Sequence, residues 1–441
     1  MKKRFLAALL ALCLVLLLTG CSGKGLGTGE ELLSPPEPSG EYAEIFAALK
    51  NSVTAKYTLK YPTKGDYRSA IIVSDLNGDK QNEAVAFYST TEENTVMVHI
   101  NFIEKSGEEY KSIGDIKIVG SDVECVEFAD LDNNGNKEII VGYNVYGNVD
   151  KQVAVYEVSN GVPVQKCLEK YTEFIICDLD FDGVSGLFIA EHDAAAKTAT
   201  AKLMQVEGGN IVQKGTCALD GNVTSLYPPK LTKLESGRPA VYIDAVKGNG
   251  TLTEVVYYDN GVLSNPFFDP ETLVTTSTFR QSSVTCRDIN SDSILEIPML
   301  SLLPTASNLV FTENVSVTKW CVPEGNNLIV TKAMYMNYID GYSLRIPDNL
   351  SGNICIMQNA DSRLRVVYLY DEKTGKATYE LFRIQVVAEN LWDSAEFKKE
   401  GLSVLARENG LVYVFGIGNF RDANTLTKEQ IVNIFALIEE E

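Results

Sequence analysis

Short acidic loops recur along the chain, and they carry the residues best suited to bind a metal ion. The first is Asp75-Leu-Asn-Gly-Asp-Lys-Gln-Asn-Glu83, with acidic or amide side chains at positions 1, 3, 5 and 9. Oxygen ligands at alternate positions of a tight loop suit a hard cation such as Ca²⁺. The predicted ligands are the side chains of Asp75, Asn77, Asp79 and Glu83 and the backbone carbonyl of Gln81.

Four further segments repeat this loop with decreasing fidelity. The second loop has predicted ligands at Asp130, Asp132, Asn134, the Asn136 carbonyl and Glu138. The fifth has them at Asp288, Asn290, Asp292, the Ile294 carbonyl and Glu296, without a turn glycine. The third offers a weaker set, Asp178, Asp180 and Asp182, and has Gly186 where the others have glutamate. The fourth, around Gly237, has lost its ligands.

Carboxylates crowded into one loop repel each other unless a cation neutralises them. We therefore expect a structural Ca²⁺ that fixes each hairpin, bound with a dissociation constant of order 10⁻⁴–10⁻³ M. The alternative is a set of Asx turns that join strands without any ion.

The elements around these loops are short apolar strands, and helices are nearly absent from this part of the chain. The loops begin at Asp75, Asp130, Asp178, about Thr232, and Asp288, a spacing near 50 residues. Four strands per unit at this period are typical of β-propeller blades. The sequence therefore predicts a mainly β protein.

The Asp-Leu-Asn-Gly-Asp-x-x-x-Glu loop between strands resembles the FG-GAP/VCBS repeat of integrin-α-type β-propellers. The resemblance covers residues 68–335 and is strongest in the first, second and fifth units. It implies a propeller of four-stranded blades over residues 41–335, with five blades favoured and six or seven as alternatives.

The two ends of the chain have other roles. Residues 1–20 combine a basic start with an apolar run that ends in Leu-Thr-Gly before Cys21, which resembles a bacterial lipoprotein signal peptide. This resemblance implies a lipid on Cys21 and a place on the outer face of the cell membrane; a simple secretory signal or a short membrane anchor is the alternative. Residues 21–40 are predicted to be a flexible linker, and residues 336–441 a smaller α+β domain that ends in a helix begun by Thr427.

Composition limits the function. The formal net charge of −20 disfavours nucleic acid as a partner. The seven cysteines beyond Cys21 have no close pairs and are expected to be mostly free thiols, with one or two disulfides left open. The two histidines, His99 and His192, belong to different units, and no recognised catalytic motif is present.

We therefore expect a lipid-anchored binding or scaffolding protein for an unknown protein or glycan ligand, and not an enzyme. The alternatives are an enzyme that acts on polysaccharide or cell-wall material, which requires carboxylates converging outside the acidic loops, and a structural subunit of an envelope assembly.

Overall fold

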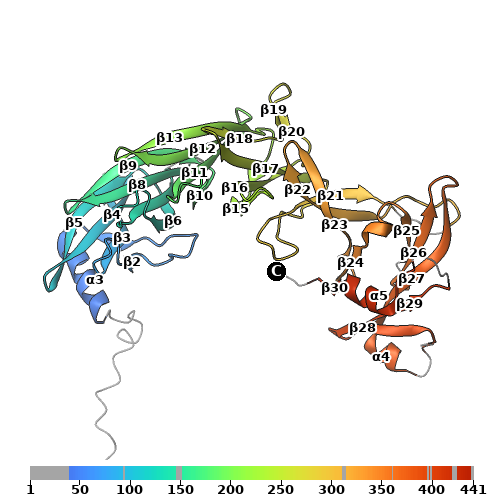
Figure 1. Ribbon diagram of the computed structural model, residues 1–441. Helices are drawn as coiled ribbons and strands as arrows, with labels where there is room; N and C mark the ends of the chain where they lie inside the picture. Colours follow the sequence, from blue (N-terminus) through green and yellow to red (C-terminus); the bar gives the residue numbers. More distant parts are fainter. Residues whose placement is uncertain are drawn as a thin grey trace, which may run out of the picture.

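The computed structural model describes residues 39–92, 95–145, 151–309, 314–359, 361–394, 397, 400–419 and 425–438. The chain is mainly β, as predicted, with antiparallel sheets of four or five strands that follow one another along an arc (Figure 1). The predicted signal peptide, Cys21 and nearly all of the predicted linker lie outside the described residues. None of the helices described is long and apolar enough to cross a membrane.

The first sheet is covered on one face by the helix α3 (Glu41–Ser52), which buries Ile45 and Leu49 against Ala84 and Tyr88. Its strands are β1 (Tyr57–Leu59), β2 (Ile71–Ser74), β3 (Glu83–Glu92), β4 (Thr95–Ser106) and β5 (Glu109–Ile118). Both β1 and β2 pair with β3. The apolar residues of this helix therefore cover one face of the first sheet.

The second and third sheets are four-stranded meanders, and each acidic loop joins the first strand of its sheet to the second. The second sheet contains β6 (Asp122–Ala129), β7 (Glu138–Asn144), β8 (Lys151–Ser159) and β9 (Val162–Tyr171). The third contains β10 (Glu173–Cys177), β11 (Gly186–Asp193), β12 (Thr198–Glu207) and β13 (Asn210–Leu219). Strand β9 contacts β5 of the first sheet and β13 of the third, so neighbouring sheets pack through their last strands.

The fourth sheet is also antiparallel, but its edge strands β14 and β18 are only two and three residues long. Its strands are β14 (Ser225–Leu226), β15 (Lys230–Lys233), β16 (Pro239–Lys247), β17 (Gly250–Asp259) and β18 (Val262–Ser264). A small hairpin of β19 (Phe268–Asp269) and β20 (Val274–Thr275) follows. Where the acidic loop is lost, a tight turn takes its place, with the Leu234 N–H donating to the Arg238 carbonyl at 2.8 Å.

The fifth sheet departs from the predicted blade. Its strands are β21 (Ile297–Leu302), β22 (Ser316–Glu324), β23 (Asn327–Asn337), β24 (Tyr342–Ile346) and β30 (Phe435–Leu437). The repeat predicts a strand before the fifth loop, and this is wrong for residues 284–286, where only an isolated bridge joins Arg287 to Glu296. The Cys286 N–H instead donates to the Asp244 carboxylate of the fourth sheet at 2.9 Å.

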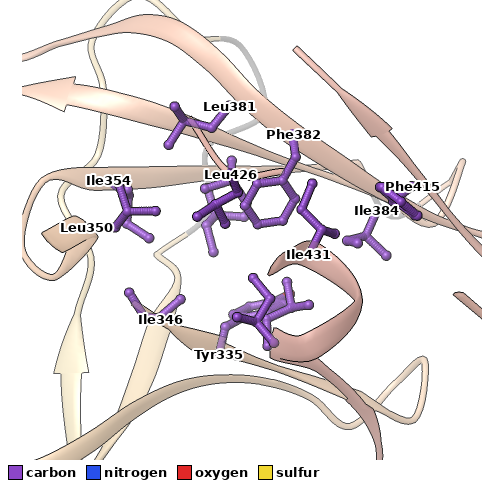
Figure 2. Close-up of a cluster of buried hydrophobic side chains, with 14 of the residues drawn as sticks. Tyr335, Ile346, Leu350, Ile354, Leu381, Phe382, Ile384, Phe415, Leu426 and Ile431 are labelled. Atoms are coloured by element: carbon purple, nitrogen blue, oxygen red, sulfur yellow. The ribbon is translucent and has the colours of Figure 1, made fainter. Parts of the chain in front are cut away.

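The sixth sheet has the order β25-β26-β27-β29-β28. Its elements are η1 (Asp348–Leu350), β25 (Ile354–Asn359), β26 (Leu364–Asp371), β27 (Lys376–Ala388), α4 (Glu389–Asp393), β28 (Leu402–Glu408), β29 (Leu411–Ile417) and α5 (Lys428–Ile434). Figure 2 shows its core, in which Phe382, Leu426 and Ile431 meet Tyr335 of the fifth sheet. The fifth and sixth sheets thus share one core.

This shared core crosses the predicted boundary at residues 335 and 336, which lies within β23. Strand β24 pairs with β23, and β30 from the end of the described chain pairs with β24. The capping box predicted at Thr427 is present, with the Gln430 N–H donating to the Thr427 hydroxyl at 3.2 Å. The helix ends at Ile434, and Phe435 begins β30.

The sheets are blade-like, but they do not form a hydrogen-bonded ring in the described part of the chain. Strand pairing links no sheet of the first four to another sheet, and Figure 1 shows the first and last sheets at opposite ends of the arc. All seven cysteines that the structure describes are free thiols, as expected for most of them. Packing between sheets, rather than covalent links, therefore holds the arc together.

Candidate functional site

Four of the five predicted loops adopt one shared backbone conformation. Positions 4 and 6 are left-handed in each of them, at Gly78 and Lys80, Asn133 and Gly135, Phe181 and Gly183, and Ser291 and Ser293. Glycine is the residue that enters this region most easily. The fifth loop reaches the same conformation with two serines, so its missing glycine does not change the fold of the loop.

The aspartate at position 1 closes each loop by accepting hydrogen bonds from backbone N–H groups. The Asp75 carboxylate accepts from Gly78 at 2.7 Å and from Lys80 at 3.0 Å. Asp288 likewise accepts from positions 4 and 6 of its loop, whereas Asp130 and Asp178 accept from positions 5 and 6. The Asx turns of the ion-free alternative occur later in the loop, where the Asn77 side chain accepts from the Asp79 N–H at 2.9 Å and the Asp79 side chain from the Gln81 N–H at 2.7 Å.

The glutamate at position 9 is buried at the start of the strand that follows the loop, as the first residue of β3 and β7 and directly before β21. Glu83, Glu138 and Glu296 each accept from the N–H of the residue at position 2, at 2.8, 2.7 and 3.0 Å. In the third loop Gly186 leaves this place open, and the Gln205 amide enters it and donates to Asp180 at 2.9 Å. A Cβ at residue 186 would come within 2.9 Å of the Gln205 side chain, which explains the glycine.

Position 3 separates the loops chemically. In the first and fifth loops the side-chain amides of Asn77 and Asn290 donate to the position 9 glutamate, at 3.2 and 2.8 Å. The second loop has Asp132 there, which has no proton to donate. Burial, with added repulsion from Asp132 and Asp130, raises the pKa of Glu138 to about 7.

Two loops bring three carboxylates together closely enough to hold a metal ion. In the second loop, oxygens of Asp130, Asp132 and Glu138 lie within 4.8 Å of one another, and in the third so do those of Asp178, Asp180 and Asp182. Hard carboxylate oxygens at this spacing fit Ca²⁺. The third loop, which seemed weaker from its sequence, therefore gathers its acids as well as the second.

The remaining predicted ligands lie where the loop pattern places them. The side-chain oxygens of Asp79, Asn134 and Asp292 at position 5 accept from the N–H groups of Gln81, Asn136 and Ile294, at 2.7, 2.7 and 2.8 Å. This bond fixes the peptide at position 7, whose carbonyl is the predicted backbone ligand. In the first and fifth loops the position 9 glutamate thus accepts a hydrogen bond from the position 3 side chain. In the second loop Glu138 faces the Asp132 carboxylate instead.

A second candidate site lies outside the acidic loops, where the first strands of the second and third sheets approach each other. It is a cavity of about 390 Å³ between β6, β10, the segment at Lys64 and Gly65, and Pro228. The segment before β2 reaches this place because the Thr63 and Lys64 N–H groups donate to β6 carbonyls, at 3.2 and 2.6 Å. We call this cavity the inner pocket.

Glu124 is the buried acid of the inner pocket and is fully paired. Its carboxylate contacts the Lys64 ammonium at 2.6 Å and the Lys151 ammonium at 3.0 Å, and it accepts a short hydrogen bond from Tyr171. Burial raises its pKa, but the three hydrogen bonds from Lys64, Tyr171 and Lys151 outweigh burial and hold that pKa below the ordinary value. Glu124 is therefore an anion at neutral pH.

Two further glutamates line the inner pocket with less compensation. Glu173 has only a distant contact with Lys151, at 3.8 Å, and burial raises its pKa. The Glu127 carboxylate makes no hydrogen bond or ion pair among the described residues. Burial together with the charge of Asp66 raises its pKa. The opposite wall is apolar, with Phe174 packed edge-on against Tyr171 at a centroid distance of 5.1 Å.

Sequence interpretation missed the inner pocket. Glu124 and Tyr171 are 47 residues apart, and only the packing of two sheets joins them. The signal that could have indicated it is a charged residue inside an otherwise apolar strand, as in Val123-Glu-Cys-Val126. Such a residue requires a partner from elsewhere in the fold.

The histidines occupy separate sheets, as expected. His99 is buried in the first sheet, with its Nδ1 2.7 Å from Asp115 and its Nε2 2.8 Å from the Thr90 hydroxyl. His192 contacts the Gly221 carbonyl at 3.3 Å. Neither lines the inner pocket.

Comparison with known proteins gives only distant likenesses. No family model matches the chain, and no curated protein matches it. Among solved structures, a rhamnogalacturonan lyase PL11 of Bacillus licheniformis is similar with a TM-score of 0.31 and 12% identity, covering 73% of this chain and 70% of the other. Rhamnogalacturonan lyase YesW has a TM-score of 0.30 and 11% identity over 73% and 76% of the two chains. A protein from Lactobacillus plantarum is similar with a TM-score of 0.28 and 9% identity, covering 72% of this chain and 84% of the other. At such TM-scores, the chemistry of the site must be judged from its own residues.

Proposed function

We propose that this protein binds a polysaccharide at the outer face of the cell membrane and that the inner pocket is its binding site. The observation that carries the proposal is the combination of Phe174 and its apolar neighbours with converging glutamates and Lys64 in one cavity. Sugars present hydroxyl groups at their edges and C–H groups on their faces, so they need both kinds of wall. The site is also formed by strands, which hold side chains more precisely than loops.

The acidic loops have a structural role in this proposal. Ca²⁺ bound by Asp130, Asp132 and Glu138 would neutralise three crowded carboxylates at the hairpin that begins β7. Residues of β6, which precedes this loop, form one wall of the inner pocket. The ion would stabilise that wall without contacting the ligand, as in FG-GAP/VCBS-like propeller blades.

Lipid attachment at Cys21 stays a prediction from the sequence. It is tested by Cys21→Ser, which should release the protein from the membrane fraction and block maturation. The measurement is cell fractionation with labelling by a palmitate analogue. Equal membrane retention and equal processing of the variant would show that another feature anchors the chain.

An enzyme that acts on polysaccharide is the second candidate, and a specific observation favours it. The inner pocket brings Glu124, Glu127 and Glu173 together outside the acidic loops, which is what this alternative required. Their environments differ: hydrogen bonds hold the pKa of Glu124 below its ordinary value, whereas burial raises the pKa values of the other two. Carboxyl groups with pKa values pushed apart are the usual arrangement for acid–base chemistry on a glycosidic bond.

A glycan array probed with the full-length protein in detergent tests the proposed function. Binding to a defined set of polysaccharides is expected, with a loss of about tenfold or more in Phe174→Ala because an aromatic contact in a desolvated pocket is removed. Exposed Phe181→Ala is the matched control, since Phe181 lies on the third loop outside the inner pocket.

The same ligands separate a binding protein from an enzyme. Chromatography of each polysaccharide after incubation detects shorter products, which only an enzyme releases. Unchanged polysaccharide together with Phe174-dependent binding supports the binding function. Product formation that Glu173→Gln abolishes supports the enzyme, and the absence of any glycan binding contradicts both.

A further inference from the structure

The arrangement of charges in the inner pocket distinguishes between classes of saccharide. The ammonium groups of Lys64, which lines the pocket, and of Lys151 lie within 3.0 Å of the Glu124 carboxylate. They are therefore already paired with a buried anion that also accepts from Tyr171. Among the described residues that line the pocket, no unpaired basic group is left for an anionic ligand.

Negative charge, in contrast, remains available at the pocket wall. No ion pair or hydrogen bond reaches Glu127 within the described residues, and Glu173 has only its 3.8 Å contact with Lys151. The three glutamates and two lysines have a formal charge of −1, and the Asp66 carboxylate adds its charge near Glu127. The net charge of the chain, −20, has the same sign. A uronic-acid polymer would be repelled by this surface.

We propose that the inner pocket binds a saccharide that carries a protonated amine, with the ammonium group at Glu127 and Glu173 and the sugar ring against Phe174. This inference rests on the proposed function and adds the chemical class of its ligand. An ammonium group donates up to three hydrogen bonds, and charge-assisted bonds to carboxylates are stronger than neutral ones. Phe174, Ile175 and Ile176 supply the apolar wall for the C–H face of the ring.

Isothermal titration of the full-length protein in detergent with three oligosaccharides of equal length tests this assignment. The probes are a glucosamine oligomer, its N-acetylated counterpart and an oligogalacturonate. The glucosamine oligomer should bind at least about tenfold more tightly than the N-acetylated one, the difference expected for loss of one charge-assisted pair. Binding should weaken as salt is added.

Glu127→Gln removes the unpaired carboxylate while keeping its shape, and it should weaken glucosamine binding about tenfold. Glu109→Gln is the matched control, because Glu109 is an exposed glutamate at the hairpin of β4 and β5, and its variant should bind as the wild type does. Thermal melting of both variants verifies folding. If Glu127→Gln melts early, Glu173→Gln provides the same test from the other carboxylate.

The outcomes separate the two levels of the proposal. Equal or tighter binding of the N-acetylated or acidic oligomer overturns the charge assignment and leaves polysaccharide binding intact. Binding of none of the three, with none on the array, contradicts the proposed function itself. Binding of an oligolysine peptide without any glucosamine oligomer assigns the pocket to a basic peptide and overturns the inference.

Discussion

The second acidic loop and the fourth sheet neutralise their carboxylates in opposite ways. In the loop, carboxylate oxygens of Asp130, Asp132 and the buried Glu138 lie within 4.8 Å of one another, and no ion pair reaches them among the described residues. In the fourth sheet, Asp244 is buried but pairs with Arg280 at 2.8 Å. The loop could accept an ion from solution, whereas the fourth sheet contains its own cation.

The fourth sheet extends this internal compensation to its other acids. The Asp220 carboxylate accepts from the Lys247 ammonium at 2.6 Å. The Glu254 carboxylate accepts from the Asp220 backbone N–H, the Thr275 hydroxyl and the Asn265 side-chain amide. These bonds fasten the segment that contains β19 and β20 onto β16 and β17. The sheet without an acidic loop therefore holds its buried carboxylates with donors from the protein itself.

The largest expected effect follows from removing the internal cation. Arg280→Met should lower stability by about 3–5 kcal/mol, because it leaves Asp244 buried without its partner. Chemical unfolding followed by tryptophan fluorescence measures the loss, which should be the same in chelator and in millimolar Ca²⁺. Exposed Arg68→Met is the control and should change stability by less than about 0.5 kcal/mol. Rescue of Arg280→Met by Ca²⁺ would contradict the division between the two regions.

A substitution at Glu124 tests whether ion pairs within the protein also stabilise a buried carboxylate near an acidic loop. Glu124→Gln should cost about 2 kcal/mol at pH 7, because it replaces charge-assisted bonds by neutral ones. Since hydrogen bonds from the lysines and Tyr171 outweigh burial and lower the folded-state pKa, this stabilisation is complete above the ordinary value of 4.5 and disappears as pH falls through the folded-state pKa. Unfolding at a series of pH values should show the wild type and variant converging in acid. A gap that stays constant into strong acid would show that packing, not charge, is lost.

The repeat of loops could be predicted because it depends on neighbouring residues. Asp75 and Glu83 lie in one turn, so their spacing already encodes the contact, and the same holds in the second and fifth loops. The mainly β fold follows from the short apolar strands for the same reason. The third loop was undervalued, since the absence of a glutamate at Gly186 hid the contribution of Gln205 from a neighbouring strand.

Long-range pairing limits prediction elsewhere. Strand β30 pairs with β24 although every strand of the sixth sheet lies between them in the sequence. No local pattern therefore indicates that the fifth sheet continues past residue 335. Cys286 was expected in a strand, but Asp244 captures its N–H. The inner pocket likewise depends on sheet packing, which spacing along the chain does not reveal.

Asp132→Asn converts the second loop to the chemistry of the first. Without Ca²⁺ the variant should be more stable than the wild type by about 1 kcal/mol, because a repulsive carboxylate becomes a donor to Glu138. In millimolar Ca²⁺ it should lose much of the roughly 1–2 kcal/mol that the ion supplies to the wild type. Thermal melting in chelator measures the expected gain in stability, and melting in millimolar Ca²⁺ measures the expected loss of stabilisation by the ion. Asp193→Asn, in an exposed Asx turn, is the control and should show no dependence on Ca²⁺.

Asn77→Asp is the reverse exchange and should have the smallest effect. It removes the 3.2 Å bond from the Asn77 amide to Glu83 and adds a fourth acid beside Asp75 and Asp79. In chelator the variant should lose about 1 kcal/mol, and Ca²⁺ should restore it because the loop then needs the cation as the second loop does. Asn77 itself is exposed, whereas Asp132 at the same position of the second loop is half-buried, so screening by water keeps the change small. If Ca²⁺ stabilises the wild type and Asn77→Asp equally, position 3 does not decide which loops depend on the ion.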